Sequence, residues 1–254
     1  MALSFRPPVM TPPWLTSFSA CLLAGSMVLG SLASAANVSG VIHVIPPGHS
    51  HPRADDLSAA NIVVWLQSVN GPAMQPIANR RAGLLQKNKT FKPHVLAIQV
   101  GTVVDFPNED PIFHSAFSNY NGQLFDLGLY APGTTRSVRF KRPGIVRVFC
   151  NIHPNMAAVI LVLDTPFFTT AASNGAYRIP DVPPGVYKLF AFDERASSQS
   201  PADPSVVVSV PEADISAPEL LISEEDYLPA PHKNKYGLDY PPSSEQDSYS
   251  GAPQ

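Results

Sequence analysis

The sequence predicts an all-β protein made of sandwich-like sheets. Only 15% of the 254 residues are charged and 28 are prolines, a loop-rich composition that is poor in helix-forming residues. Beyond the first 35 residues, short β-branched and apolar runs are separated by turn residues, without a sustained 3.6-residue apolar period. Both observations favour strands over helices, and the many short runs favour sandwiches.

The N-terminal residues have the features of a secretory signal peptide. An apolar stretch from about Trp14 to Leu32 is followed by Ala33-Ser34-Ala35, which has the small-x-small form of a cleavage site. We therefore expect residues 1–35 to be removed near Ala35, giving a periplasmic or otherwise exported protein with no membrane span in its mature form. A retained anchor and a lipoprotein at Cys21 are the alternatives.

The remaining chain offers ten strands in order, each bounded by Gly, Pro, Asn or a polar loop. Pro107-Asn108 ends one of them, and Lys141-Arg142-Pro143-Gly144 is a turn between two others. The predicted strands are Val38–Val44, Ile62–Gln67, Val95–Val100, Val103–Phe106, Arg136–Phe140, Ile145–Phe149, Val159–Leu163, Ala176–Ile179, Val186–Phe192 and Val206–Val210.

From about Ser223 the composition changes to acidic residues, prolines, serines, glycines and tyrosines. Such a segment has too little apolar surface to order itself, so we expect residues 223–254 to be a disordered tail. Its tyrosines could instead form a motif for a partner.

Charge and motifs exclude several classes of function. The net charge is −3 without a long basic run, so nothing indicates a nucleic-acid partner. The sequence shows no nucleophile–base motif, Gly-rich phosphate loop or evident carboxylate pair. We therefore expect a protein that is not an enzyme.

The most informative stretch is Phe149–Met156, in which Cys150, His153 and Met156 are spaced three residues apart after a strand. His114 follows a separate strand upstream. A thiolate, two imidazoles and a weak thioether are the ligands of a blue-copper site. Signal cleavage would leave Cys150 as the sole cysteine, so a buried inert thiol is the alternative. Zinc is the competing metal, but structural zinc prefers more cysteines.

These residues resemble a plastocyanin-like cupredoxin. The resemblance is carried by Phe91–Val95, Val100–Asn108, Phe113-His114-Ser115, the turn at 141–144 and the strand into Cys150. The Cys-x2-His-x2-Met spacing is similar to that of amicyanin, and residues 88–168 resemble exported proteins labelled "methylamine utilization protein". The resemblance implies a Greek-key sandwich over residues 81–164.

The resemblance also implies a site and a role. It gives one type 1 copper ion, with His114 and His153 as nitrogen ligands, Cys150 as thiolate and Met156 as weak axial ligand. The protein would be a one-electron carrier for a redox partner protein. His153 would lie near the surface, with Pro154 and Ala157 as an apolar docking rim.

One departure from the plastocyanin pattern concerns the residues beside the ligands. Many cupredoxins have Asn after the first histidine and Ser or Thr after the cysteine, whereas this chain has Ser115 and Asn151. We expect this exchanged pair to hydrogen-bond across the site and hold the thiolate strand.

A second domain is indicated on both sides of the cupredoxin-like segment. The pattern Thr169–Tyr187 resembles a carboxypeptidase-regulatory-like (transthyretin-like) β-sandwich, whose usual first strands appear upstream at 38–42 and 60–66. We therefore predict a split domain formed by residues 36–80 and 165–222, interrupted by the cupredoxin. The rival is one enlarged cupredoxin followed by a complete small C-terminal domain.

Two alternatives remain for function and several for the other histidines. The same ligands would serve copper storage or delivery, and an accessory or scaffolding protein is the third class. His94 could be a further ligand, although a structural or exposed role is favoured. His43, His49 and His51 could form a separate weak metal site, although a solvated loop is favoured.

Overall fold

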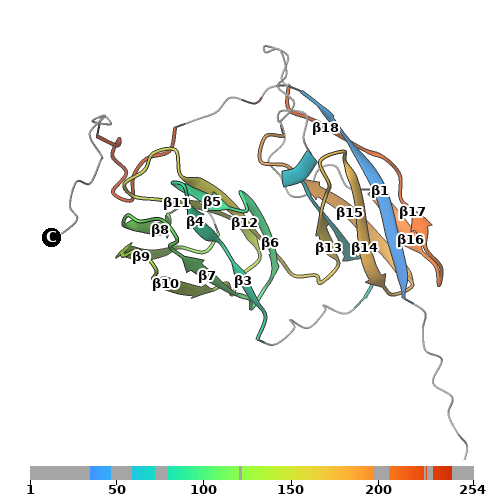
Figure 1. Ribbon diagram of the computed structural model, residues 1–254. Coiled ribbons are helices and arrows are strands. Elements are labelled where there is room, and N and C mark those ends of the chain that lie inside the picture. The colour runs from blue at the N-terminus through green and yellow to red at the C-terminus, as the bar shows by residue number, and fades with distance from the viewer. Residues whose placement is uncertain are drawn as a thin grey trace, which may run out of the picture. The chain divides into compact units, whose positions relative to one another are not determined.

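The computed structural model describes residues 35–46, 59–71, 79–119, 122–196, 206–225, 227 and 231–241 (Figure 1). The expected signal peptide, up to residue 34, and the loop with His49 and His51 lie outside the described residues. The expected all-β class is confirmed, with one short 3-10 turn, η2 (Ala59–Asn61), beside the strands. The part of the chain that the structure describes contains no helix with the length and apolar character needed to cross a membrane.

The first sandwich contains the strands from the middle of the chain. These are β3 (Arg81–Gly83), β4 (Leu85–Lys87), β5 (Thr90–Lys92), β6 (Val95–Gln99), β7 (Val103–Pro107), β8 (His114–Ser118), β9 (Phe125–Tyr130), β10 (Thr135–Arg139), β11 (Gly144–Phe149) and β12 (Ala157–Leu163). One sheet has the order β6-β12-β11-β8-β9 and another the order β10-β7-β3, while β4 and β5 form a hairpin.

Apolar residues from these sheets meet in one core. Phe106, Phe140, Val148 and Ile160 are fully buried there, in the same cluster as Cys150. Alternation along each strand explains the arrangement, because successive side chains point to opposite faces. The core therefore holds the strand that leads into the cysteine.

The second sandwich contains the strands from both ends of the described chain. These are β1 (Ala36–Ile45), β2 (Val63–Ser68), β13 (Phe168–Thr170), β14 (Ala176–Val182), β15 (Gly185–Phe192), β16 (Val206–Val210), β17 (Ile215–Ser216) and β18 (Leu220–Ser223). β1 pairs with β14, β17 and β18, and β2 pairs with β13 and β15. The chain thus leaves this sandwich after β2 and returns to it at β13.

This connectivity bears on the split-domain interpretation. β1 pairs with β14 and β2 pairs with β15, so both N-terminal strands pair with strands beyond residue 165, while the split domain itself stays a prediction. The strand at Val95–Gln99 pairs instead with β12, in parallel. The likeness of this sandwich to a transthyretin-like domain stays a prediction from sequence.

Aromatic and aliphatic side chains from the two sandwiches form a further buried cluster. β6 and β12 contribute Val95, Val159, Leu161 and Leu163, and β2 and β15 contribute Val63, Trp65, Phe190 and Phe192. Trp65 stacks on Phe190 with ring centroids 5.1 Å apart. β12 is therefore buried on both faces, which explains its continuous apolar run AAVILVL.

An ion-pair network lies beside this cluster. Glu194 Oε2 contacts His94 Nε2 at 2.6 Å, and Glu194 Oε1 contacts Arg147 Nη1 at 2.6 Å. The hydrogen bond to Glu194 raises the pKa of His94. Burial raises the pKa of Glu194, but the hydrogen bonds and charges of His94 and Arg147 outweigh it and hold that pKa below its ordinary value. His94 thus has the structural role favoured from sequence.

The C-terminal region differs from expectation. We expected disorder from residue 223, but residues 231–241 form an ordered segment that contacts the end of β11. Its turn is closed by the amide of Gly237, which has a φ of 78° and donates to the carbonyl of Asn234. The composition missed this order because the contacts come from residues far away in sequence. Residues 242–254 lie outside the described residues.

The His94–Glu194 pair predicts a specific pH dependence of stability. The raised pKa of His94 stabilises the fold below its ordinary 6.5, and this contribution is lost as pH rises through the raised value. The lowered pKa of Glu194 stabilises the fold above its ordinary 4.5, and this contribution is lost as pH falls. In a double-mutant cycle with His94→Gln and Glu194→Gln, measured by urea unfolding, the coupling should be larger near about pH 5.5 than near about pH 8.5.

The exposed pair Lys87–Glu109, 3.2 Å apart, provides the matched control for this cycle. Its coupling should be small and equal at the two pH values. Equal coupling at both pH values for the His94–Glu194 pair would contradict the prediction.

Candidate metal centre

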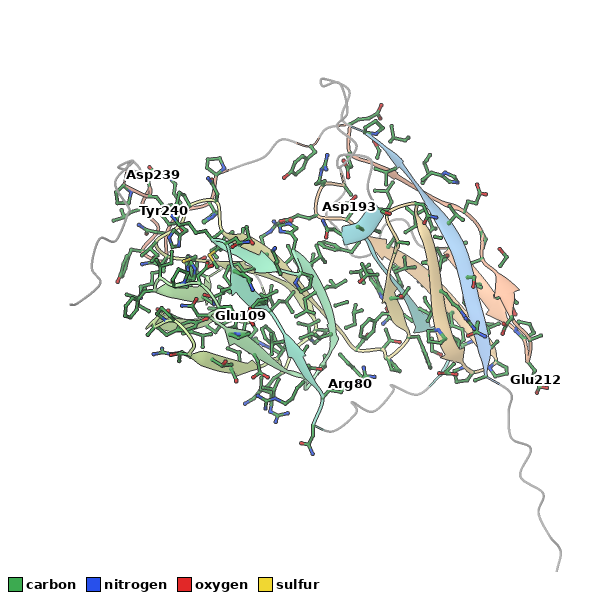
Figure 2. All side chains as sticks on the ribbon, in the orientation of Figure 1. Arg80, Glu109, Asp193, Glu212, Asp239 and Tyr240 are labelled. Atoms are coloured by element: carbon green, nitrogen blue, oxygen red, sulfur yellow. The ribbon has the colours of Figure 1, made fainter. Side chains whose placement is uncertain are left out.

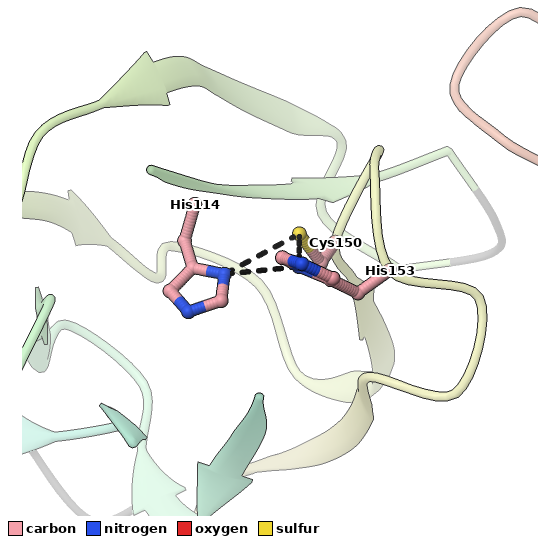
Figure 3. A group of neighbouring side chains, drawn as sticks. All are labelled: His114, Cys150 and His153. Carbon is pink, nitrogen blue, oxygen red and sulfur yellow. Dashed lines mark hydrogen bonds between the residues drawn. The ribbon is translucent and has the colours of Figure 1, made fainter. Parts of the chain in front are cut away.

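Three of the predicted ligands meet at one end of the first sandwich (Figure 3). His114 opens β8, Cys150 directly follows β11, and His153 lies in the loop that leads to β12. Their ligand atoms all lie within 4.8 Å of one another. In the described ranges, this is the one group of His, Cys, Asp or Glu side chains gathered closely enough to hold a metal ion.

The distances between the donor atoms suit one metal ion placed among them. The two imidazole Nδ1 atoms are 3.1 Å apart, and Cys150 Sγ lies 3.9 Å from His114 Nδ1 and 3.5 Å from His153 Nδ1. Metal–nitrogen bonds of about 2.0 Å and metal–sulfur bonds of about 2.3 Å at trigonal angles place N and S about 3.8 Å apart. The residues present therefore fit a metal ion bound by two imidazoles and a thiolate.

Cys150 is fully buried, yet its environment favours the thiolate. Burial raises the pKa of the thiol, but hydrogen bonds from His114, His153 and the backbone of Ile152 and Ser115 outweigh it and lower the pKa to about 5. The thiolate is the metal-binding form of cysteine. The sulfur is thus ready to bind a cation at neutral pH.

A carboxylate that the sequence analysis missed orients His114. Asp110 Oδ2 lies 2.7 Å from His114 Nε2, and both side chains are buried. In the neutral imidazole the carboxylate accepts the Nε2 proton, so that Nδ1, which faces Cys150, carries the lone pair that would bind a metal ion. Burial lowers the pKa of His114, but the hydrogen bonds to Cys150 and Asp110 outweigh it and raise that pKa.

The β4–β5 hairpin holds Asp110 in turn. The backbone amides of Asn88 and Lys89 donate to its two oxygens at 2.6 and 2.8 Å. Both residues have positive φ angles, of 57° and 54°, which turn their amides toward the carboxylate. Burial raises the pKa of Asp110, but these amides and His114 outweigh it and lower the pKa. No sequence motif marks Asp110, because its partners come from a distant hairpin.

The ligand loop folds back, so that the backbone of Met156 lies beside the backbone of Cys150. The Cys150 amide donates to the Met156 carbonyl at 3.0 Å, and the Met156 amide donates to the His153 carbonyl at 3.1 Å. The Met156 side chain is 1% exposed and belongs to the same apolar cluster as Cys150. Its role as axial ligand stays a prediction.

The expected link between Ser115 and Asn151 exists in a different form. The Asn151 backbone amide donates to Ser115 Oγ at 2.8 Å, and Ser115 Oγ lies 3.7 Å from Cys150 Sγ. The hydrogen bond across the site thus runs from the Asn151 backbone, while Asn151 Oδ1 accepts the amide of Lys235 at 3.0 Å. Ser115 still ties β8 to the residue that follows the thiolate.

Two other described histidines, His43 and His94, contact carboxylates outside this group. His94 is occupied by Glu194, and His43 contacts the exposed Glu219 at 3.1 Å. At the rim of the site, His153 and Ala157 are half-buried and Pro154 is exposed, and a docking role for this rim stays a prediction. Phe113 and Ile152, each adjacent to a ligand in sequence, are both 46% exposed.

Comparisons with known proteins find similarity over part of the chain only. No protein-family profile and no curated protein matches the sequence. Among solved structures, a purple cupredoxin from Nitrosopumilus maritimus is 25% identical, with a TM-score of 0.30, over 34% of this chain and 100% of that chain. A reduced amicyanin variant is 17% identical, with a TM-score of 0.32, over 34% of this chain and 86% of that chain.

A copper-containing nitrite reductase from Thermus scotoductus is also similar. It is 24% identical, with a TM-score of 0.31, over 49% of this chain and 28% of that chain. The assignment of individual residues therefore rests on the side-chain geometry described above.

The Asp110–His114 contact predicts a loss of metal affinity on substitution. Asp110→Asn cannot accept the Nε2 proton equally well and should weaken Cu(II) binding by about 10–100-fold, as loss of a carboxylate that hydrogen-bonds to a ligating histidine typically does. Competition titration against a chelator measures this. Glu109→Gln is the control, because that neighbouring carboxylate is exposed and contacts Lys87 instead. Equal affinities for the two variants would contradict the prediction.

The hydrogen bond to the Ser115 hydroxyl predicts an effect on the stability of the metal-free protein. Ser115→Ala leaves the Asn151 amide without its acceptor and should reduce the free energy of unfolding by about 1–2 kcal/mol. Urea unfolding of the metal-free protein measures this. The control is Ser118→Ala on the same strand, because Ser118 Oγ is buried without a hydrogen-bond partner among the described residues. The prediction is wrong if Ser118→Ala proves as destabilising as Ser115→Ala.

Proposed function

We propose that the chain binds one copper ion through His114, Cys150 and His153, with Met156 as weak axial ligand, and acts as an exported one-electron carrier. The observation that supports this most directly is the cluster of two imidazole nitrogens and one cysteine sulfur, which all lie within 4.8 Å of one another. When bound, copper would supply a one-electron couple between Cu(II) and Cu(I).

The donor set favours copper over the other metals. Thiolate and thioether ligands suit Cu(I), and imidazole suits both oxidation states of copper. Zinc sites with a single cysteine normally add carboxylate or histidine ligands, or keep a water. The group of close ligand atoms contains no carboxylate, because Asp110 contacts the far nitrogen of His114.

The protein residues hold the donors in place for both oxidation states. His114 is fixed by Asp110, and Cys150 is held by the Met156 carbonyl and by Ser115. Because the side chains of His114 and Cys150 are fully buried, water does not reach them to replace either one as a ligand. A site with little freedom to rearrange suits electron transfer, since reorganisation slows that reaction.

The exposed residues around His153 favour docking of an electron-transfer partner, and the ligand set favours a role without catalysis. His153 is half-buried, with exposed Ile152 and Pro154 beside it in the loop. Such a small apolar rim suits brief docking of a redox partner protein. Four protein ligands leave no position for a substrate, so we infer that the chain is not an enzyme.

The test is the colour and redox behaviour of the copper-loaded mature chain. We expect an intense visible thiolate-to-copper absorption and reversible one-electron reduction, both abolished by Cys150→Ala because the thiolate is lost. His94→Gln is the control and should keep the colour, because His94 contacts Glu194 and not the ligand group.

A colourless copper complex, with an affinity that Cys150→Ala leaves unchanged, would rule out the proposal. Rapid transfer of the copper from a coloured protein to a chelator would favour storage or delivery instead of electron transfer.

A further inference from the structure

Residues 231–241, here called the strap, contact three consecutive residues around the thiolate. The His232 ring stacks on the Phe149 ring, with centroids 4.1 Å apart. The Tyr240 hydroxyl donates to the Cys150 carbonyl at 2.7 Å, and the Lys235 amide donates to Asn151 Oδ1 at 3.0 Å. Figure 2 labels Tyr240 and its neighbour Asp239 on this segment. The strap thus contacts the end of β11 and the start of the ligand loop.

The strap completes the hydrogen bonding of the Cys150 backbone. The Cys150 amide donates to the Met156 carbonyl within the ligand loop, whereas its carbonyl accepts from Tyr240. Cys150 is 0% exposed, so without the tyrosine hydroxyl a buried carbonyl would lose a partner. The strap therefore contributes a bond at the ligand residue itself.

The strap also contacts Asn151, one member of the exchanged Ser115 and Asn151 pair. Ser115 is short and accepts the Asn151 amide across the site. The longer Asn151 side chain is then free to point outward, where it accepts the Lys235 amide. Asn151 is held from both sides, by β8 within the sandwich and by the strap outside it.

Two aromatic side chains of the strap, His232 and Tyr240, contact each other. Because the Tyr240 hydroxyl gives its proton to the Cys150 carbonyl, it accepts from His232 Nδ1 at 3.2 Å. The two rings meet edge to face with centroids 5.2 Å apart. His232 therefore orients the hydroxyl of Tyr240 while its own ring covers Phe149.

The strap is fastened to the first sandwich at a second place. Lys235 Nζ lies 2.9 Å from Asp126 on β9, and Lys233 pairs with Asp239 within the strap. The Asn234 side chain accepts the amides of Tyr236 and Leu238 at 2.9 and 3.1 Å, which fixes the turn. The segment thus has internal order and contacts on both β9 and β11.

We propose that residues 231–241 act as a strap that fixes the thiolate-bearing end of β11, and that Tyr240 is a positioning residue for Cys150. The proposal deepens the proposed function, since the role of the strap at a copper site rests on copper binding there. The fixing of β11 by the strap is a property of the metal-free chain.

The first experiment measures amide hydrogen exchange by NMR on the metal-free full chain. In Tyr240→Phe the ring remains and the hydrogen bond is lost, so the Lys235 and Asn151 amides should exchange faster, on the order of tenfold. The Ile160 amide, in the middle of β12, should be unchanged and reports that the fold is intact. The control is Tyr236→Phe, because Tyr236 is 71% exposed and contacts Lys235 of its own segment.

The second experiment measures the visible absorption bands of the Cu(II)-loaded proteins. Tyr240→Phe should change the relative intensities of the thiolate-to-copper bands, whereas Tyr236→Phe should leave the wild-type spectrum. Exchange and spectra that are the same in both variants would overturn the proposal. If the wild-type chain gives no copper colour, the proposed function fails, and the exchange rates still decide whether the strap fixes β11.

Discussion

The structure of the site depends on the burial of one thiolate. A buried anion is costly unless hydrogen bonds and positive partners compensate for the lost water. Cys150 receives this compensation from His114, His153 and backbone amides, and the result is a pKa lowered to about 5. Three further contacts hold either these partners or the cysteine itself in place. Asp110 orients one imidazole, Ser115 joins two strands, and Tyr240 binds the carbonyl of the cysteine itself.

The β framework provides the rigidity that these contacts need. The ligands come from the start of β8, the end of β11 and the loop before β12, and β11 lies between the other two strands in one sheet. The second sandwich covers the outer face of β6 and β12 with Trp65 and Phe190. β12 is consequently packed on both faces, and the loop that carries His153 starts and ends on strands that cannot easily shift.

The sequence predicted the parts of the site that depend on short-range spacing. Cys150, His153 and Met156 lie on one loop, so their spacing indicated a metal site, and His114 was added as the second imidazole that a blue-copper ligand set needs. Asp110 could not be found in the same way, because its role depends on amides from the β4–β5 hairpin. The strap was missed for a related reason. Its composition predicts disorder, and its order comes from contacts such as Tyr240 to Cys150, 90 residues apart.

These contacts also bear on the choice between the two copper functions proposed for the site. Delivery of copper requires ligands that a partner can reach and replace in turn. Here His114 and Cys150 are 0% exposed and Met156 is 1% exposed, so His153 is the one predicted ligand that reaches the surface. Asp110 and the strap further restrain the two innermost donors from behind. A site that exposes one imidazole edge and encloses every other donor favours the passage of an electron over the passage of the ion.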